Sequence, residues 1–295
     1  MQANLMLSPI GIGTYLGNAD EATDRNYANA IVRAVQLGVN VIDSAANYRF
    51  QRSERSIGAA LKTLAAEHGV SRDKLVICTK GGYLPFDGAP PRDVREYVNE
   101  TFVKPGIASF EDFVGGSHCM TPAYLQNQLD QSLRNMGIER VDVYYIHNPE
   151  SQLGDVSKNE FYSRLKLAFE RLEQNRSDGK LANYGVATWS GFRAAADSPN
   201  HHSLERMFEI AREVGGDDHG FRFIQLPFNL AMQEGRPTLE AAKRLGVTVV
   251  ASASLLQGRI EPKAAIEFVR SVPEITTALI GMSRVEHVEQ NLGQD

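Results

Sequence analysis

Four side chains of this sequence have the types needed to pass a proton to a carbonyl oxygen: Asp43, Tyr48, Lys80 and His147. They end or follow three apolar runs, VNVIDSAANY, LVICTKGG and VDVYYIHNPE. A tyrosine hydroxyl has a pKa near ~10, so it is a weak acid at neutral pH unless a neighbouring positive charge favours its phenolate. We expect Lys80 to supply that charge and Asp43 to keep the lysine protonated.

The imidazole of His147 completes this set, because it can hydrogen-bond a carbonyl oxygen or relay a proton. Together the four groups would polarise a C=O bond and protonate the alkoxide that forms from it. Each has an ordinary explanation when taken singly, such as a strand-ending Asp or a packed Tyr. Their shared place at the ends of successive strand-like runs favours a catalytic site, which lacks only a source of electrons.

The elements that must position these residues alternate between two kinds. Short β-branched runs predict strands at 10–14, 39–44, 75–80, 141–147, 184–188, 223–228, 248–253 and 278–281. Amphipathic patterns predict helices at 27–37, 54–67, 124–135, 161–175, 204–214, 239–245 and 263–272. Eight nearly all-apolar strands alternating with helices favour a closed (β/α)8 TIM barrel over an open parallel sheet. Chemistry in such barrels lies at the carboxyl ends of the strands.

One domain is expected over residues 1–295, with a long insertion at 81–121 at the carboxyl end of the barrel. This insertion mixes aromatic residues with Pro and Gly. Structureless loops longer than ~15 residues are uncommon and usually functional. We expect a lid or a substrate-binding loop here, with an oligomer contact as the alternative.

The composition excludes several classes of protein. A net charge of −5 argues against nucleic-acid binding, which requires a surplus of Lys and Arg. No run approaches the ~20 apolar residues of a membrane span, and the start of the chain lacks the pattern of a secretory signal. The two cysteines, Cys78 and Cys119, have no metal-like spacing. We expect a cytoplasmic protein without membrane or nucleic-acid partners; its oligomeric state is left open.

The motifs resemble those of the aldo-keto reductases over nearly the whole chain. The resemblance consists of Asp43 followed five residues later by Tyr48, the pair Ser53-Glu54, the strand end Thr79-Lys80, and His147 shortly before a proline. It implies that Tyr48 is the general acid, that Lys80 and Asp43 tune it, and that His147 orients the carbonyl. It also implies reversible reduction of aldehydes or ketones to alcohols, with hydride supplied by NADPH, or alternatively by NADH.

The same resemblance implies a set of cofactor contacts around the barrel mouth. These residues are Gly13, Thr14, Tyr15, Asp43, Thr188, Gln225, Ser252, Ser254, Leu255, Gln257, Gly258, Gly281, Ser283, Arg284, His287, Gln290 and Asn291. Four residues at three places depart from the family pattern: Ala187-Thr188 replaces Ser-Asn, Ser252 replaces a nicotinamide-stacking Tyr, and His287 stands where Arg is frequent. Arg284 favours NADP over NAD.

An aromatic pocket for a small carbonyl substrate is expected from Tyr15, Tyr83, Phe86 and Trp189, with packing of the loops as the alternative. The substrate itself is not specified. A cofactor-sensing or regulatory binding module on the same fold is the alternative function.

Two other motifs are set aside. Tyr162 and Lys166 match the Tyr-x-x-x-Lys of short-chain dehydrogenases, but the Gly-rich turn of that family is missing. His201-His202 are adjacent, and no spaced ligand completes a metal site. No metal is expected.

Overall fold

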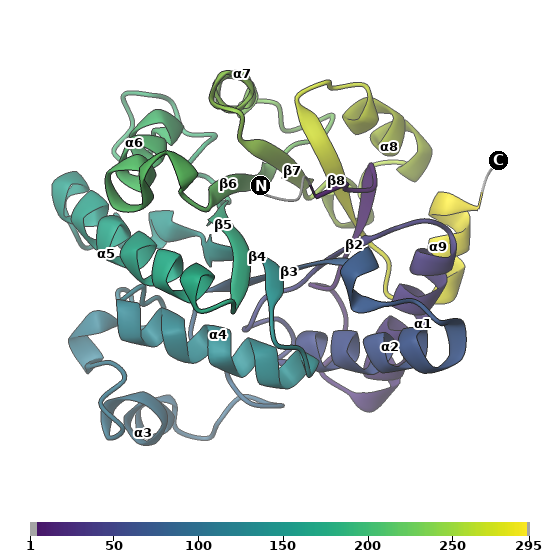
Figure 1. Ribbon diagram of the computed structural model, residues 1–295, viewed down its shortest axis with the longest axis horizontal. Coiled ribbons are helices and arrows are strands. Elements are labelled where there is room, and N and C mark those ends of the chain that lie inside the picture. The colour runs from purple at the N-terminus through teal and green to yellow at the C-terminus, as the bar shows by residue number, and fades with distance from the viewer. Residues whose placement is uncertain (1–4, 294–295) are drawn as a thin grey trace.

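The computed structural model describes residues 5–293. Within this range eight parallel strands close into a barrel in sequence order, with β8 hydrogen-bonded to β1 (Figure 1). The strands are β1 (Ile10–Gly13), β2 (Val41–Asp43), β3 (Val76–Gly81), β4 (Val141–His147), β5 (Leu181–Ala187), β6 (Phe221–Pro227), β7 (Thr248–Ser252) and β8 (Ile275–Gly281). The predicted (β/α)8 TIM barrel is confirmed.

Helices surround the strands and follow them in turn (Figure 1). They are α1 (Glu21–Gln36), α2 (Arg52–His68), α4 (Pro122–Met136), α5 (Lys158–Ser177), α6 (Leu204–Gly215), α7 (Arg236–Leu245), α8 (Pro262–Arg270) and α9 (Val285–Leu292), with the short α3 (Val94–Val98) in the insertion. Helix α1 begins six residues before its predicted start, because the Asp20 side chain caps it by accepting from the backbone N–H of Thr23 at 2.7 Å.

Apolar side chains form two layers, one inside the barrel and one between the strands and the helices. The inner layer includes Val76, Val143, Tyr145 and Phe223. Because side chains alternate along a strand, Thr79 of β3 points outward to Glu54 on α2 while Lys80 points inward. The alternation of side chains along β3 therefore places Lys80 inside the barrel, at the carboxyl end of the strand.

The insertion after β3 is not structureless, which corrects the loop that we expected. It contains α3, a π-helical turn (Asn99–Val103) and a 3₁₀ turn (Phe110–Asp112). Its own apolar cluster includes Phe102 and Phe113, which pack against Tyr124 of α4. Its two ends meet where Tyr83 bridges to His118, beside the end of β4.

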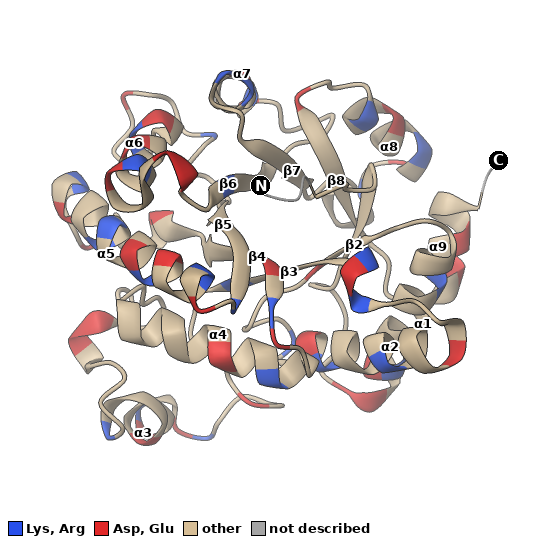
Figure 2. Cartoon of the chain, in the orientation of Figure 1, with Lys and Arg blue, Asp and Glu red and all other residues tan. Residues whose placement is uncertain are grey.

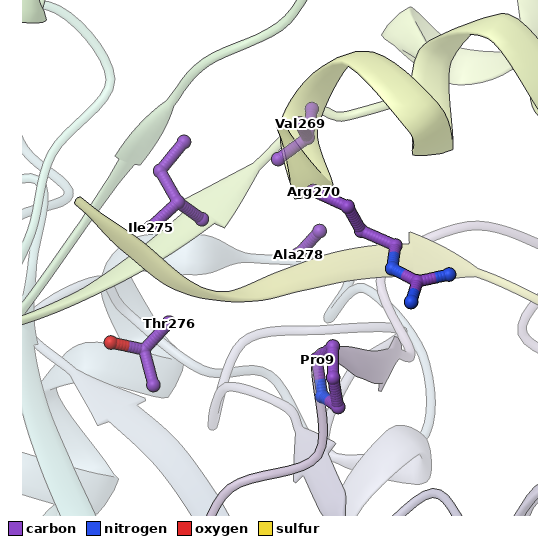
Figure 3. Close-up of a pocket in the computed structure, with 6 residues that line it drawn as sticks. All are labelled: Pro9, Val269, Arg270, Ile275, Thr276 and Ala278. Carbon is purple, nitrogen blue, oxygen red and sulfur yellow. The ribbon is translucent and has the colours of Figure 1, made fainter. Parts of the chain in front are cut away.

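The outer helices carry charges of both signs, and a hollow lies near the amino-terminal end of the barrel. Positions occupied by Lys or Arg and by Asp or Glu are interspersed along the outer helices (Figure 2). No helix within residues 5–293 is long and apolar enough to cross a membrane. A hollow of about 190 Å³ lies beside β8, lined by Pro9, by Ile275 and Ala278 of β8 and by Val269 of α8, among others (Figure 3). It lies at the end of the barrel opposite to His147 and Lys80.

Candidate functional site

A buried ion pair lies at the carboxyl ends of β2 and β3. Lys80 Nζ donates to Asp43 Oδ1 at 2.5 Å and to the Ser44 carbonyl at 2.7 Å. Its third neighbour is the Tyr48 hydroxyl at 3.4 Å. The side chains of Lys80 and Asp43 are 0% and 4% exposed, whereas Tyr48 is only partly buried. The structure thus brings three of the four predicted catalytic residues together, with the tyrosine on the accessible side.

Burial and charge act in opposite directions on this group. Burial alone would lower the pKa of Lys80, but Asp43 and Tyr48 together raise it, so the lysine stays charged. For Tyr48, burial raises the pKa more than Lys80 lowers it. Lys80 supplies the positive charge that we expected, but its effect on the pKa of Tyr48 is smaller than that of burial. Lys80 limits a rise that burial would otherwise make larger.

His147 lies on the other side of Tyr48. The two rings meet edge to face with centroids 5.6 Å apart, and Tyr83 makes a similar contact with His147 at 5.1 Å. Burial, followed by the charge of Lys80, holds the pKa of His147 well below its usual range, so the imidazole is neutral. Its Nδ1 has no hydrogen-bond partner within residues 5–293. A neutral, buried imidazole with a free nitrogen can hydrogen-bond an incoming carbonyl group.

The backbone of His147 is held by the insertion. His118 Nε2 donates to the His147 carbonyl at 2.8 Å, since a carbonyl oxygen only accepts, and His118 Nδ1 then accepts from Gln152 at 2.9 Å. Burial lowers the pKa of His118 to about 4, in agreement with the neutral tautomer that this network requires. The insertion therefore holds the backbone at the carboxyl end of β4 through the hydrogen bond from His118.

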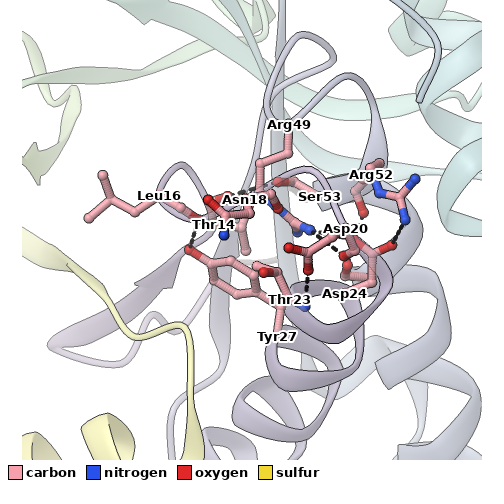
Figure 4. Close-up of polar contacts among 11 residues, drawn as sticks. Thr14, Leu16, Asn18, Asp20, Thr23, Asp24, Tyr27, Arg49, Arg52 and Ser53 are labelled. Carbon is pink, nitrogen blue, oxygen red and sulfur yellow. Dashed lines mark hydrogen bonds and ion pairs between the residues drawn. The ribbon is translucent and has the colours of Figure 1, made fainter. Parts of the chain in front are cut away.

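A strained turn follows Tyr48. Arg49, Phe50 and Gln51 have φ values of 49°, 58° and 68°, all in the left-handed region that non-glycine residues seldom occupy. Such a run persists only where its surroundings enforce it. The Arg49 side chain donates to the Asn18 carbonyl at 2.8 Å and forms an ion pair with Asp24, as Figure 4 shows.

The same region is tied to the neighbouring strands. Arg52 forms an ion pair with Asp24 at 2.6 Å, and the Ser53 hydroxyl donates to the Thr14 carbonyl at 2.8 Å (Figure 4). The Thr14 hydroxyl in turn donates to the Asp43 carbonyl at 3.0 Å. These contacts fix the turn that presents Tyr48 to the mouth.

The predicted cofactor residues lie at or beyond the carboxyl ends of the strands. Gln225 of β6 donates to Asp43 Oδ2 at 2.9 Å, so it is engaged with the ion pair. The buried hydroxyls of Thr188, after β5, and Ser254, after β7, have no hydrogen-bond partner in the described part of the chain. Buried hydroxyls without a partner are unfavourable unless a ligand or water meets them.

The remaining predicted cofactor residues surround the ends of β1, β7 and β8. Gly13 ends β1, followed by Thr14 and Tyr15; Ser252 ends β7, followed by Leu255, Gln257 and Gly258; Gly281 ends β8, followed by Ser283, Arg284, His287, Gln290 and Asn291 on or before α9. Arg284 is exposed at the start of α9, with a terminal nitrogen 3.0 Å from His287 Nε2. A helix start with an exposed Arg can hold a phosphate group.

The four predicted substrate residues are not equivalent. Tyr15, 58% exposed, meets the ring of Tyr48 edge to face at 5.0 Å, and Tyr83 contacts His147 as described. Trp189 follows β5 and is 48% exposed. Phe86 instead packs with Phe50 at 6.2 Å and with Tyr97 at 5.5 Å. Tyr15 and Tyr83 therefore have ring contacts with the catalytic candidates. Phe86 packs against Phe50 and against Tyr97 of the insertion instead.

Tyr162 and His202 lie away from this group. The Tyr162 hydroxyl accepts from the backbone N–H of Ser203, and His202 stacks on Phe161 with ring centroids 4.7 Å apart. Within residues 5–293 no group of three or more His, Cys, Asp or Glu could hold a metal ion.

Sequence reasoning missed the residues that support the site. Arg49, His118, Gln152 and Glu150 were not among the predicted residues. The one available signal was nearness in the sequence, since Arg49 follows Tyr48 directly and Glu150 and Gln152 lie within five residues of His147. Their supporting contacts join segments far apart in the chain, such as Arg49 with Asn18 and His118 with Gln152, and no local pattern reveals them.

Comparison with known proteins identifies similar chains. The Aldo/keto reductase family matches residues 9–266. The D-threo-aldose 1-dehydrogenase of a Pseudomonas species is 27% identical over 63% of this chain, and the NADH-specific methylglyoxal reductase of Escherichia coli is 26% identical over 62%. These alignments cover 51% and 49% of the two relatives, so the chain spans about half their length.

Solved structures share the fold. An aldo/keto reductase from Klebsiella pneumoniae, crystallised with NADP and acetate, superposes with a TM-score of 0.65 at 18% identity, over 97% of this chain and 85% of that one. At this identity the likeness concerns the barrel alone.

Proposed function

Because the chain belongs to the aldo/keto reductase family, we propose that it is an NAD(P)H-dependent oxidoreductase that reversibly reduces aldehydes or ketones to alcohols. The observation that carries this proposal is the contact of Lys80 Nζ with both Asp43 (2.5 Å) and the Tyr48 hydroxyl (3.4 Å). A lysine whose pKa is raised by Asp43 and Tyr48, beside a partly exposed tyrosine, is an arrangement for donating a proton to a developing alkoxide.

The roles of the four residues follow from their positions. Tyr48 donates the proton to the carbonyl oxygen, and Lys80 stabilises the phenolate that remains. Asp43 keeps Lys80 protonated in a buried site. Neutral His147 donates a hydrogen bond to the carbonyl oxygen and so orients it beside Tyr48. This division needs no change in the charge of His147 during the reaction.

A nicotinamide cofactor fits the polar groups at the mouth. The unpartnered hydroxyls of Thr188 and Ser254 would hold the carboxamide and phosphate ends of such a molecule, and Arg284 would meet an adenosine phosphate. When bound, the cofactor supplies the hydride that the protein's own side chains lack. Arg284 favours NADPH over NADH. The NADP found with the Klebsiella structure supports the same assignment.

The test is the substitution Tyr48→Phe. We expect kcat for carbonyl reduction by NADPH to fall by about 10²–10⁴-fold, the range for loss of a general acid, while the Kd for NADPH is unchanged. Absorbance of NADPH follows turnover and fluorescence titration follows binding. Unchanged turnover would remove Tyr48 from the mechanism. NADPH binding by the wild type without turnover of any carbonyl would favour a regulatory module instead.

A further inference from the structure

One carboxylate fixes the loop that follows β5. Glu150 lies three residues after His147, and its side chain is 10% exposed. Its Oε1 accepts the backbone N–H groups of Trp189 at 2.6 Å, Ser190 at 2.8 Å and Gly191 at 3.4 Å. A carboxylate that gathers successive N–H groups makes charge-assisted bonds to all of them. These bonds determine the direction in which the chain leaves β5.

The same loop is held on its far side. Arg193 forms an ion pair with Glu234 at 3.3 Å, and the Phe192 carbonyl accepts from the Thr238 hydroxyl at 3.2 Å. Both partners belong to the segment around α7. Anchors from β4 on one side and from α7 on the other leave this part of the loop with one defined path.

Close packing at Gly191 further restricts the loop. The His202 backbone N–H donates to the Gly191 carbonyl at 2.8 Å. A Cβ added at Gly191 would lie 2.3 Å from His202 Cδ2, so no side chain fits there. The ring of His202 is itself stacked on Phe161. Trp189 is therefore presented by a preorganised loop.

Several large apolar side chains are exposed just after the carboxyl ends of the strands, and Trp189 is one of them. Trp189 is 48% exposed, and Tyr15, which follows β1 on the opposite side of the closed barrel, is 58% exposed. Leu16, also after β1, and Leu230, after β6, are 39% and 42% exposed. Tyr15 contacts the ring of Tyr48, so an exposed aromatic side chain stands beside the proposed general acid, and apolar walls at such a site suit an apolar ligand.

We infer that Glu150 is a positioning residue that holds Trp189 as a fixed wall, and that this wall selects aldehydes and ketones carrying an aromatic or extended apolar group beside the carbonyl. The inference rests on the proposed reductase function. Glu150 acts only through the backbone of the Trp189 loop. Its loss therefore changes substrate selection more than the chemical step.

The experiment compares Glu150→Ala with the wild type on two aldehydes, 4-nitrobenzaldehyde and propanal, with NADPH. For Glu150→Ala we expect KM for 4-nitrobenzaldehyde to rise about tenfold, the equivalent of one lost aromatic contact, with kcat and the propanal constants within about twofold. Glu150→Gln keeps an acceptor oxygen and should restore most of the difference. Glu213→Gln, an exposed carboxylate on α6, is the matched control and should behave as the wild type.

Fluorescence reads the loop directly, because Trp189 is the only tryptophan in the sequence. Glu150→Ala should shift its emission to the red and increase its quenching by acrylamide, and Trp189→Ala should reproduce the KM effect without Glu150 being altered. Equal losses on both aldehydes, or unchanged emission, would overturn the inference. If the wild type reduces propanal but not 4-nitrobenzaldehyde, the substrate class fails while the proposed function stands, and the emission shift decides separately whether Glu150 holds Trp189.

Discussion

At the ends of β2 and β3 the polar side chains bond to one another, whereas at the ends of β7 and β8 they face solvent or lack a partner within residues 5–293. The single side chain of Lys80 contacts three neighbours, Asp43, Ser44 and Tyr48. On the other half, the Ser254 hydroxyl is buried without a partner, and Arg284 is exposed.

This difference corresponds to the two tasks proposed for the site, proton transfer and cofactor binding. The half proposed to transfer the proton is assembled by contacts within the protein, so its geometry does not depend on a ligand. The half proposed to bind the cofactor presents groups that become satisfied only when a ligand meets them. Substitutions should therefore act differently on the two halves: in the first they change stability and rate, and in the second they change affinity.

The largest effect is expected from Lys80→Met. Removing one partner of a buried ion pair leaves Asp43 uncompensated, which costs about 3–5 kcal/mol of unfolding free energy. Reduction should slow by roughly 10²–10⁴-fold, because Tyr48 loses the charge that stabilises its phenolate. Urea unfolding and steady-state kinetics measure the two effects.

The double variant Asp43→Asn/Lys80→Met is the control for this prediction. It should recover much of the lost stability without recovering activity, because no unpaired charge remains buried. A single variant as stable as the wild type would show that the two halves do not differ in the way proposed.

A smaller effect is expected from Arg49→Met. Its side chain is 2% exposed and holds the strained turn through Asn18 and Asp24. Loss of these charged hydrogen bonds should cost about 2 kcal/mol of stability. Displacement of Tyr48 should reduce kcat roughly tenfold or more. Arg25→Met on the exposed face of α1 should change neither quantity, and equal behaviour of the two variants would contradict the role of the turn.

The dependence on pH tests the proton-transfer half without mutation. Burial raises the pKa of Tyr48, so the acid form needed for reduction should persist up to at least the ordinary tyrosine value of ~10. Above the raised pKa, kcat/KM for reduction should fall about tenfold per pH unit, while alcohol oxidation, which needs the phenolate, should increase as pH rises. A fall in reduction well below pH ~9 would contradict the raised pKa.

The pKa of Lys80 has a related consequence for stability. Burial lowers this pKa, but Asp43 and Tyr48 raise it overall above its usual value. A raised folded-state pKa gives stability that is complete below the unfolded lysine value of ~10.4 and is lost as pH rises through the folded value. Unfolding free energies measured across the alkaline range should decline accordingly.

The smallest effect is expected in the cofactor half. Arg284→Ala should raise the Kd for NADPH by about five- to tenfold and leave both the Kd for NADH and the stability nearly unchanged. Arg270→Ala, beside the hollow at the other end of the barrel, is the control. Equal weakening of both cofactors would show that Arg284 does not contact the extra phosphate.

Most of the fold follows from local patterns. Every barrel strand was predicted within a few residues, because buried parallel strands read as continuous apolar runs. The start of β5 was missed: Leu181 to Asn183 pair with β4, but Asn183 is polar. The helices of the insertion were also missed, because they are stabilised by packing of Phe102 and Phe113 against Tyr124 rather than by a long amphipathic pattern.

The candidate site was predictable in part. Asp43, Lys80 and Tyr48 converge because strand ends in a barrel converge, which is a consequence of topology. The direction of the Tyr48 pKa shift was not predictable, because it depends on how deeply the hydroxyl is buried. The left-handed turn at Arg49 was hidden as well: no glycine marks it, and the contacts that enforce it come from a different loop.

The hollow beside β8 offers this barrel a place to gain stability far from the proposed active site. Pro9, Ile275 and Ala278 line it at the end of the barrel remote from Tyr48, so filling it with larger apolar side chains should add stability without disturbing turnover (Figure 3). The additional folding stability would allow the loops at the carboxyl ends of the strands to accumulate destabilising substitutions that change substrate specificity. The two ends of one fold can then be selected separately, one for robustness and the other for new chemistry.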